Sequence, residues 1–206
     1  KLLHGHVEAL VEAGVDAIWY PCMSYNNDEG IGDNHYNCPV VAYYPELLAA
    51  NVPALKKTKF LDPYVGLWRH KDCAKRLSEL FYTEFQIPKK ETKAAVETAY
   101  DAYNAYVEDI HKTGEQYIEE ARAQGKPIIV MAGRPYHIDP EINHGINDLI
   151  TSFGFVLITE DTLAYREGYE PRTVLNQWTF QSRMYNAARY VCTQKDMQMV
   201  QLVSFG

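Results

Sequence analysis

The stretch Pro127-Ile-Ile-Val-Met-Ala132 is apolar throughout and runs directly into the turn residues Gly133-Arg-Pro-Tyr-His137. A short apolar run bounded by turn signals is typical of a strand that is buried on both faces of a parallel sheet. Two further segments, residues 155–159 and 199–204, have a similar apolar character and predict two more strands. Residues 125–206 are therefore predicted to form an α/β segment with a parallel sheet.

The crossovers between these strands carry the signals of helices. Asp139 is a residue type that caps helix N-termini, and Pro140 suits the first helical position. Together they predict a helix over residues 141–153, which Gly154 ends, and a second helix is predicted over residues 174–193. Strands and helices therefore alternate, which predicts parallel-sheet βα units with right-handed crossovers.

The beginning of the chain has a related but looser pattern. Apolar residues at helical spacing predict a helix over residues 1–13, and a short apolar run predicts a strand over residues 15–20. Residues 21–37 are dense in Asn, Asp and Gly, so they predict a long irregular loop. Residues 40–44 predict a second strand, and Pro45 suits the first turn of a following helix. This order is that of another α/β layer.

The middle of the chain predicts two helices, over residues 69–85 and 91–124. A seam of apolar and small residues follows the second helix at helical spacing and consists of Val96, Tyr100, Tyr103, Val107, Ile110, Gly114, Tyr117 and Ala121. Such a seam faces another helix, either that of residues 69–85 or a partner in a coiled coil. We therefore predict an α/β protein in which residues 1–64 and 125–206 form α/β segments and residues 65–124 a helical insert.

Composition excludes several classes of protein. The chain has 206 residues with 47% hydrophobic and 23% charged residues, as in an ordinary globular protein. Its formal net charge is −7 and its basic residues are not clustered, so no nucleic-acid partner and no membrane surface is expected. No apolar run approaches the about 18 residues of a membrane span and no signal peptide is visible, which predicts a cytoplasmic protein.

The turn after the first quoted strand is one candidate binding site, because ligands of parallel sheets sit beyond the carboxyl ends of the strands. Arg134, His137 and His144 are expected to converge there with the N-terminus of the next helix. These groups could hold an anion or a carbonyl oxygen of a small molecule. The alternative is a capped turn whose histidines bond the backbone.

Cysteines mark a second candidate site. The count of four is too low for a disulfide framework in a chain of this length. Cys22 ends one predicted strand and Cys38 enters the next, so their thiols could meet at one end of the sheet as ligands of an iron–sulfur cluster or zinc, with His35 nearby. The alternative is a pair of buried structural thiols. Cys73 and Cys192 lie in helical apolar patterns and are expected in the core.

Eight short motifs follow one another along nearly the whole chain: Lys1-Leu-Leu-His-Gly-His6, Tyr20-Pro-Cys22, Asp33-Asn-His-Tyr-Asn-Cys-Pro39, Tyr44-Pro-Glu46, Gly133-Arg-Pro-Tyr-His137, Asp139-Pro140, Asn143-His-Gly145 and Gln201-Leu-Val-Ser-Phe-Gly206. In this order they resemble a known family, the large activase-related proteins of the 2-hydroxyacyl-CoA dehydratase system. The resemblance concerns the region of those proteins that is homologous to dehydratase subunits.

The resemblance implies an anaerobic bacterial protein whose full length also carries ATPase modules. In that system, ATP hydrolysis drives one electron into a cysteine-ligated 4Fe–4S cluster, and the electron allows a 2-hydroxyacyl-CoA to lose water. By position, Cys22 and Cys38 become candidate cluster ligands, while Arg134, His137 and His144 become candidates for the surroundings of the substrate or the cluster.

The resemblance also implies that the sequence is a fragment. Further cysteines of the family precede the first motif and follow the last, so we expect the cluster to be absent from this fragment and the fragment to be inactive alone. The leading hypothesis is an iron–sulfur domain of an acyl-CoA dehydratase activase, with ATP bound in other domains and an acyl-CoA or a dehydratase as partner. The competing hypothesis is a non-catalytic α/β binding module that docks the ATPase modules or another partner.

Overall fold

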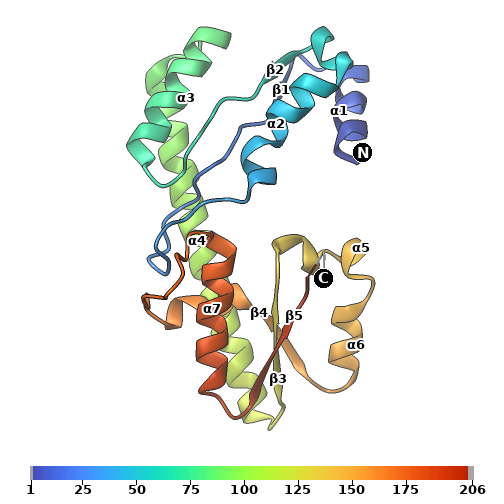
Figure 1. Ribbon diagram of the computed structural model, residues 1–206, viewed down its shortest axis with the longest axis vertical. Helices are drawn as coiled ribbons and strands as arrows, with labels where there is room; N and C mark the ends of the chain where they lie inside the picture. The colour runs from blue at the N-terminus through green and yellow to red at the C-terminus, as the bar shows by residue number, and fades with distance from the viewer. Residues whose placement is uncertain (1, 204–206) are drawn as a thin grey trace. The chain divides into compact units, whose positions relative to one another are not determined.

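The computed structural model describes residues 2–203, which form two compact units (Figure 1). Unit 1 contains residues up to 27 and residues 35–98, and unit 2 contains residues 28–34 and those from 99 onward. Both units combine helices with short parallel strands, so the predicted α/β class is confirmed. The division of the chain into two α/β segments and a helical insert stays a prediction.

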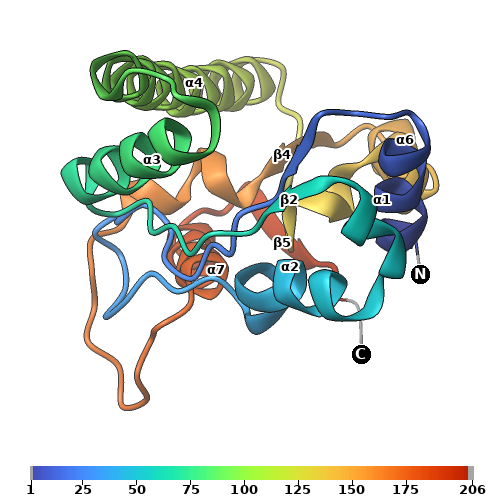
Figure 2. The ribbon, with the colours of Figure 1, turned by 90° about the horizontal axis from the view of Figure 1, so that it is seen from above.

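Unit 1 is built on two short parallel strands that pair with Ile18 opposite Phe60. Its elements are α1 (Leu2–Glu12), β1 (Ala17–Trp19), α2 (Pro39–Asn51), the 3-10 helix η1 (Pro53–Lys57), β2 (Lys59–Leu61) and α3 (His70–Phe85). Figure 2 shows α1 and α2 beside η1, the segment that leads into β2. The helices join the strands through a buried cluster made of Val7, Ile18, Leu48, Val52 and Leu55. The predictions of α1, β1 and α3 are therefore confirmed within the described residues.

The predicted strand over residues 40–44 is wrong. This segment lies in α2, which begins at Pro39, so Pro45 is inside the helix and not in its first turn. The buried residues Ala42, Pro45 and Leu48 are spaced by one helical turn, and this spacing outweighs the β propensity of the valines. The strand that pairs with β1 is β2, which was not predicted because Lys59 leaves it with only two apolar residues.

Unit 2 contains a three-stranded sheet in the order β4-β3-β5, and both pairings are parallel as predicted. Its elements are the part of α4 (Lys89–Ala123) from residue 99 onward, β3 (Ile128–Ala132), η2 (Pro135–Ile138), α5 (Pro140–Asn143), α6 (Ile146–Ser152), β4 (Val156–Thr159), η3 (Glu160–Thr162), η4 (Ala164–Arg166), α7 (Thr179–Cys192) and β5 (Met197–Gln201). Figure 1 shows α4 and α7 on one side of this sheet and α6 on the other. The last predicted strand residue, Ser204, lies outside the described residues.

Two helix boundaries in unit 2 differ from the prediction. The helix expected over residues 141–153 is divided into α5 and α6, because His144 and Gly145 both adopt left-handed backbone conformations, with φ of 54° and 82°. The helix expected over residues 174–193 begins only at Thr179. Helical spacing alone did not reveal either change. The segment before Thr179 is held by hydrogen bonds between Asn176 and the distant Asp33, and the break lies beside the local hydrogen bonds of Asn143.

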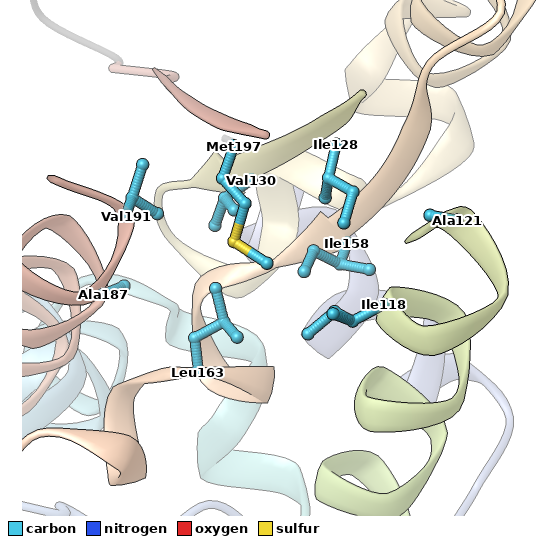
Figure 3. Packing of buried hydrophobic residues seen from close by; sticks show 9 residues of the cluster. All are labelled: Ile118, Ala121, Ile128, Val130, Ile158, Leu163, Ala187, Val191 and Met197. Carbon is cyan, nitrogen blue, oxygen red and sulfur yellow. The ribbon is translucent and has the colours of Figure 1, made fainter. Parts of the chain in front are cut away.

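The core of unit 2 lies between the sheet and the helices α4 and α7. Figure 3 shows that side chains from the three strands, from α4 and α7, and from the residue after η3 face one interior. The residues of this core are Ile118, Ala121, Ile128, Val130, Ile158, Leu163, Ala187, Val191 and Met197. Because Ile128 and Val130 are two apart on β3, they share the face of the sheet that this core covers.

The predicted seam of α4 is buried or half-buried except at Tyr117, but its C-terminal half faces η3 and the sheet of unit 2 and not another helix as expected. Tyr117 is half exposed, at 50%, and Ile118 occupies the core in its place. Gly114 is buried on this face, where a Cβ atom would lie 2.5 Å from the Cβ of Thr162. The glycine therefore allows α4 to approach η3 closely.

Gly114→Ala is expected to lower the free energy of unfolding by about 1–2 kcal/mol. An extra methyl group in a packed core typically costs about 1–3 kcal/mol of stability. The higher helix propensity of Ala offsets up to about 1 kcal/mol of this cost. Thr162 cannot rotate freely, because it is buried and its hydroxyl donates to the carbonyl of Thr159 at 2.7 Å. Urea denaturation followed by circular dichroism measures the change.

Gly5→Ala is the matched control, since Gly5 lies within α1 and a Cβ there meets nothing within 4 Å. This exchange should stabilise the chain by about 0.5–1 kcal/mol. Equal stabilisation by both substitutions would contradict the close approach of α4 to Thr162.

Candidate functional site

The carboxyl end of β3 leads into a tight turn at Gly133. A Cβ atom at this position would lie 2.4 Å from the Nδ1 atom of His137, so the imidazole needs the space that a glycine leaves. The Nδ1 atom accepts a hydrogen bond from the backbone N–H of Arg134 at 2.9 Å. His137 is buried, and its ring is therefore part of the internal structure of the turn.

Asn143 holds the second half of the same turn. Its buried amide donates to the carbonyl of His137 at 2.9 Å and accepts from the backbone N–H of Asn147 at 2.9 Å. Asp139 caps α5 as predicted, by accepting from the backbone N–H groups of Glu141 and Ile142. One buried amide thus connects η2, α5 and α6.

The three residues expected to converge at this turn have different surroundings. The guanidinium of Arg134 lies over the ring of Phe180, with its central carbon 5.4 Å from the ring centroid. His144 is exposed and ends α5, and it does not lie inside the first turns of a longer helix as expected. His137 bonds the backbone, as in the capped-turn alternative, and the use of all three residues as a ligand site stays a prediction.

Cys22 lies beyond the carboxyl end of β1 and extends the parallel pairing through a bridge to Tyr64. Its side chain is fully buried, with 0% exposure. Burial raises the pKa of the thiol, a backbone hydrogen bond from Glu46 lowers it, and the nearby carboxylates of Glu46 and Asp62 raise it. The thiol therefore stays protonated at neutral pH unless a cation replaces the proton.

The loop between Cys22 and Cys38 begins and ends as a narrow antiparallel ribbon, which we define as residues 23–26 and 35–37. Tyr25 pairs with Tyr36 in this ribbon, and the backbone N–H of Asn37 donates to the carbonyl of Ser24 at 2.9 Å. Because Cys22 precedes the ribbon and Cys38 follows it, the ribbon joins the backbone segments that carry the two cysteines.

Asn37 is the clamp of this ribbon. It is only 6% exposed, and its amide donates to the carbonyl of Met23 at 3.0 Å. The amide oxygen of Asn37 accepts from the amide of Asn26 at 3.3 Å. Asn37 therefore fixes the chain beside both cysteines, a role that its type as a turn former did not reveal.

The cysteines differ from expectation in two respects. Cys38 does not enter a strand but takes the N-cap position of α2, where its carbonyl accepts from the N–H of Ala42 at 3.0 Å. Cys192 is exposed at the end of α7 and does not lie in the core, whereas Cys73 is buried in α3 as expected. All four cysteines lie within the described residues and are free thiols. Among residues 2–203, no group of three or more His, Cys, Asp or Glu is arranged to hold a metal ion.

An acid–base cluster in unit 2 was not predicted from the sequence. The guanidinium of Arg183 on α7 binds both carboxylate oxygens of Glu29, at 2.5 Å and 2.8 Å. Burial lowers the pKa of Arg183, but the hydrogen bonds and the charge of Glu29 raise it overall. Glu160 and Asp161 follow β4 and face the same cation.

Two members of this cluster have strongly altered acidity. Burial, followed by the charge of Asp161, raises the pKa of Glu160 to about 7. Burial lowers the pKa of His111 on α4, although the carboxylates of Asp161 and Glu29 oppose the effect. The position of Glu160 directly after a predicted strand is a signal that could have revealed it, since groups at that end of a parallel sheet often form sites.

A comparison with protein families assigns the chain. A family model described as the CoA enzyme activase uncharacterised domain matches residues 1–163. The chain belongs to this family. The predicted relationship to acyl-CoA dehydratase activase-related proteins is therefore confirmed. Neither the curated proteins nor the solved structures contain a match to the chain.

The matched region of this CoA enzyme activase domain contains the two cysteines that flank the ribbon, the turn after β3 and Glu160. Arg183 lies beyond it. No helix among residues 2–203 is both long and apolar enough to cross a membrane.

Proposed function

We propose that this CoA enzyme activase domain is an iron–sulfur domain that takes part in ATP-driven one-electron transfer, with Cys22 and Cys38 as two of its cluster ligands. The observation that supports the proposal most directly is the ribbon, because the Asn37 clamp joins the backbone segments next to both thiols. A backbone hydrogen bond from Glu46 also acts to lower the pKa of the Cys22 thiol, against the effect of burial. Such hydrogen bonds stabilise a ligating thiolate and tune the potential of a cluster.

The described residues fit only part of a cluster site. A 4Fe–4S cluster takes four cysteine thiolates, whereas only Cys22 and Cys38 flank the ribbon and the remaining cysteines are in α3 and α7. Further ligands would have to come from outside residues 2–203. When bound, the cluster would supply one-electron chemistry, and the contribution of this chain would be to orient two thiols and to exclude water from Cys22.

The other parts of the proposal rest on the resemblance to the activase-related proteins. ATP would bind to other modules of the parent chain, and an acyl-CoA or a dehydratase would be the partner. The turn with Arg134, His137 and His144 would lie in the surroundings of that substrate or of the cluster. The protein would work in the cytoplasm of an anaerobic bacterium.

Cys22→Ser and Cys38→Ser test this proposal in the full-length parent protein. The parent is purified without oxygen, reconstituted, and analysed for iron, sulfide and visible absorption. Each substitution is expected to remove most of the iron and the absorption, because serine is a poor cluster ligand. Cys192→Ser is the matched control, since this thiol is exposed and should leave the iron content unchanged.

A colourless, iron-free parent after reconstitution would contradict the proposal. The proposal would also be contradicted if neither Cys22→Ser nor Cys38→Ser lowered the iron content. Either result would favour the alternative function, a non-catalytic module that docks the ATPase modules or a partner. The complete burial of Cys22 and the raised pKa of its thiol are the observations that favour this alternative.

A further inference from the structure

The segment of residues 28–34 is attached to unit 2 although it lies within the sequence of unit 1. Its first attachment is the ion pair between Glu29 and Arg183, which are 154 positions apart in sequence. The side chains are 26% and 16% exposed, so the pair is largely shielded from water. In a bidentate ion pair that is largely removed from water, a further charge nearby changes the strength of the pair more than it would at an exposed site.

Asp33 provides the second attachment of the segment. Its carboxylate accepts from the backbone N–H of Asn176 at 2.6 Å and from the hydroxyl of Tyr169. The backbone N–H of Asp33 donates in turn to the carbonyl of Asn176 at 2.8 Å. Between the two attachments, a Cβ at Gly32 would lie 2.5 Å from the Oγ of Ser182, so the segment packs directly on α7.

Glu160 is the buried group that can change the charge around the Glu29–Arg183 pair. Its carboxyl is influenced by Asp161 on its own element, by Arg183 from α7 and by Glu29 from the segment. The groups of the other neighbouring elements are His111 and Tyr103 of α4, which act on the same cluster, and Tyr165 and Arg166 of η4, which pair with Glu115. β3 contributes no charged side chain.

We propose that residues 28–34 are a latch on unit 2 and that loss of the proton from Glu160 loosens it. While Glu160 is neutral, Arg183 faces two carboxylates, those of Glu29 and Asp161. When Glu160 gives its proton to solvent, a third negative charge attracts the guanidinium of Arg183 and repels the carboxylate of Glu29. Both effects weaken the same ion pair.

The change occurs near neutral pH, because burial and the neighbouring carboxylates hold the pKa of Glu160 at about 7. The latch is therefore closed in mildly acidic solution and loosens as the pH rises through neutrality. This inference does not depend on the iron–sulfur proposal. It concerns the attachment of the loop that joins the two halves of the ribbon.

Hydrogen exchange followed by mass spectrometry tests the latch in the whole chain. The protection of peptides covering residues 28–34 is compared between wild type and Glu160→Gln at about pH 5.5 and about pH 8.5, so that the intrinsic exchange rate cancels. The two proteins should agree at the lower pH. At the higher pH, residues 28–34 should be more protected in Glu160→Gln than in wild type. The expected factor is about ten for each unit by which the pKa of Glu160 is lower with the latch open than with the latch closed.

Two further variants make the result specific. Glu29→Gln removes the negative end of the ion pair, so it should reduce protection of residues 28–34 at both pH values. Glu119→Gln makes the same substitution at an exposed site of α4 and should behave as wild type. Peptides that cover β3 report global opening, so at each pH their protection should follow the free energy of unfolding measured by urea denaturation. Residues 28–34 should open more readily than β3 and should therefore be less protected than these peptides.

An equal protection ratio at both pH values would overturn the latch. The same holds if Glu119→Gln reproduces the effect of Glu160→Gln, since the cause would then be net charge. Protection of residues 28–34 equal to that of the β3 peptides in every protein and at both pH values would also overturn it, because the segment would then open only with the whole unit.

Discussion

Arg183→Met is expected to lower the free energy of unfolding by about 3 kcal/mol at neutral pH. Removal of one partner from a buried ion pair typically costs about 3–5 kcal/mol, because the other charge stays buried without compensation. Here the loss removes the cation whose charge stabilises the carboxylates of Glu29 and Asp161. The lower end of the range applies because Glu29 lies on a loop and keeps 26% exposure. Urea denaturation of the whole chain measures the effect.

Arg189→Met is the matched control for this prediction. Arg189 lies on the same helix, pairs with Glu167 and Glu170, and is 34% exposed. Exposed ion pairs contribute at most about 1 kcal/mol, so this substitution should have a small effect. The double variant Glu29→Gln with Arg183→Met should recover part of the lost stability. Equal losses of stability from Arg183→Met and Arg189→Met would show that the ion pair of Arg183 with Glu29 contributes no more than an exposed ion pair.

The strands of unit 2 could be predicted because their cause is local. β3 is buried along its whole length, so five consecutive apolar residues mark it in the sequence. In α2 the same kind of apolar run belongs to a helix, since burial there recurs once per turn at Ala42, Pro45 and Leu48. A short apolar run does not distinguish these cases by itself, and the packing partners decide.

The candidate sites were only partly predictable for a related reason. Cys22 and Cys38 stood out by residue type, but Asn37, which holds the chain beside them, resembles any other loop asparagine. The pairing of Glu29 with Arg183 joins positions 154 residues apart and leaves no pattern in the sequence. Residue type predicts which chemistry is available, whereas long-range folding determines which groups meet.

Glu160→Gln is expected to stabilise the chain in a strongly pH-dependent way. Burial raises the pKa of Glu160 from its ordinary value of 4.5 to about 7 in the folded protein. Between these values the folded state binds more protons than the unfolded state, so the wild type loses stability as the pH rises through this window. The total loss is about 3 kcal/mol, since each unit of pKa corresponds to about 1.4 kcal/mol.

The difference between Glu160→Gln and wild type isolates this contribution, because other titrating groups affect both proteins. The variant should be more stable by up to about 3 kcal/mol at about pH 8, and the difference should disappear near about pH 4.5. Urea denaturation at a series of pH values gives the curve, and its midpoint reports the pKa of Glu160. A difference that is constant with pH would mean that Glu160 is ionised in the folded protein throughout, with Arg183 rather than a proton as its partner. That result would remove the basis of the latch as well, because the charge near Glu29 would then not change around neutrality.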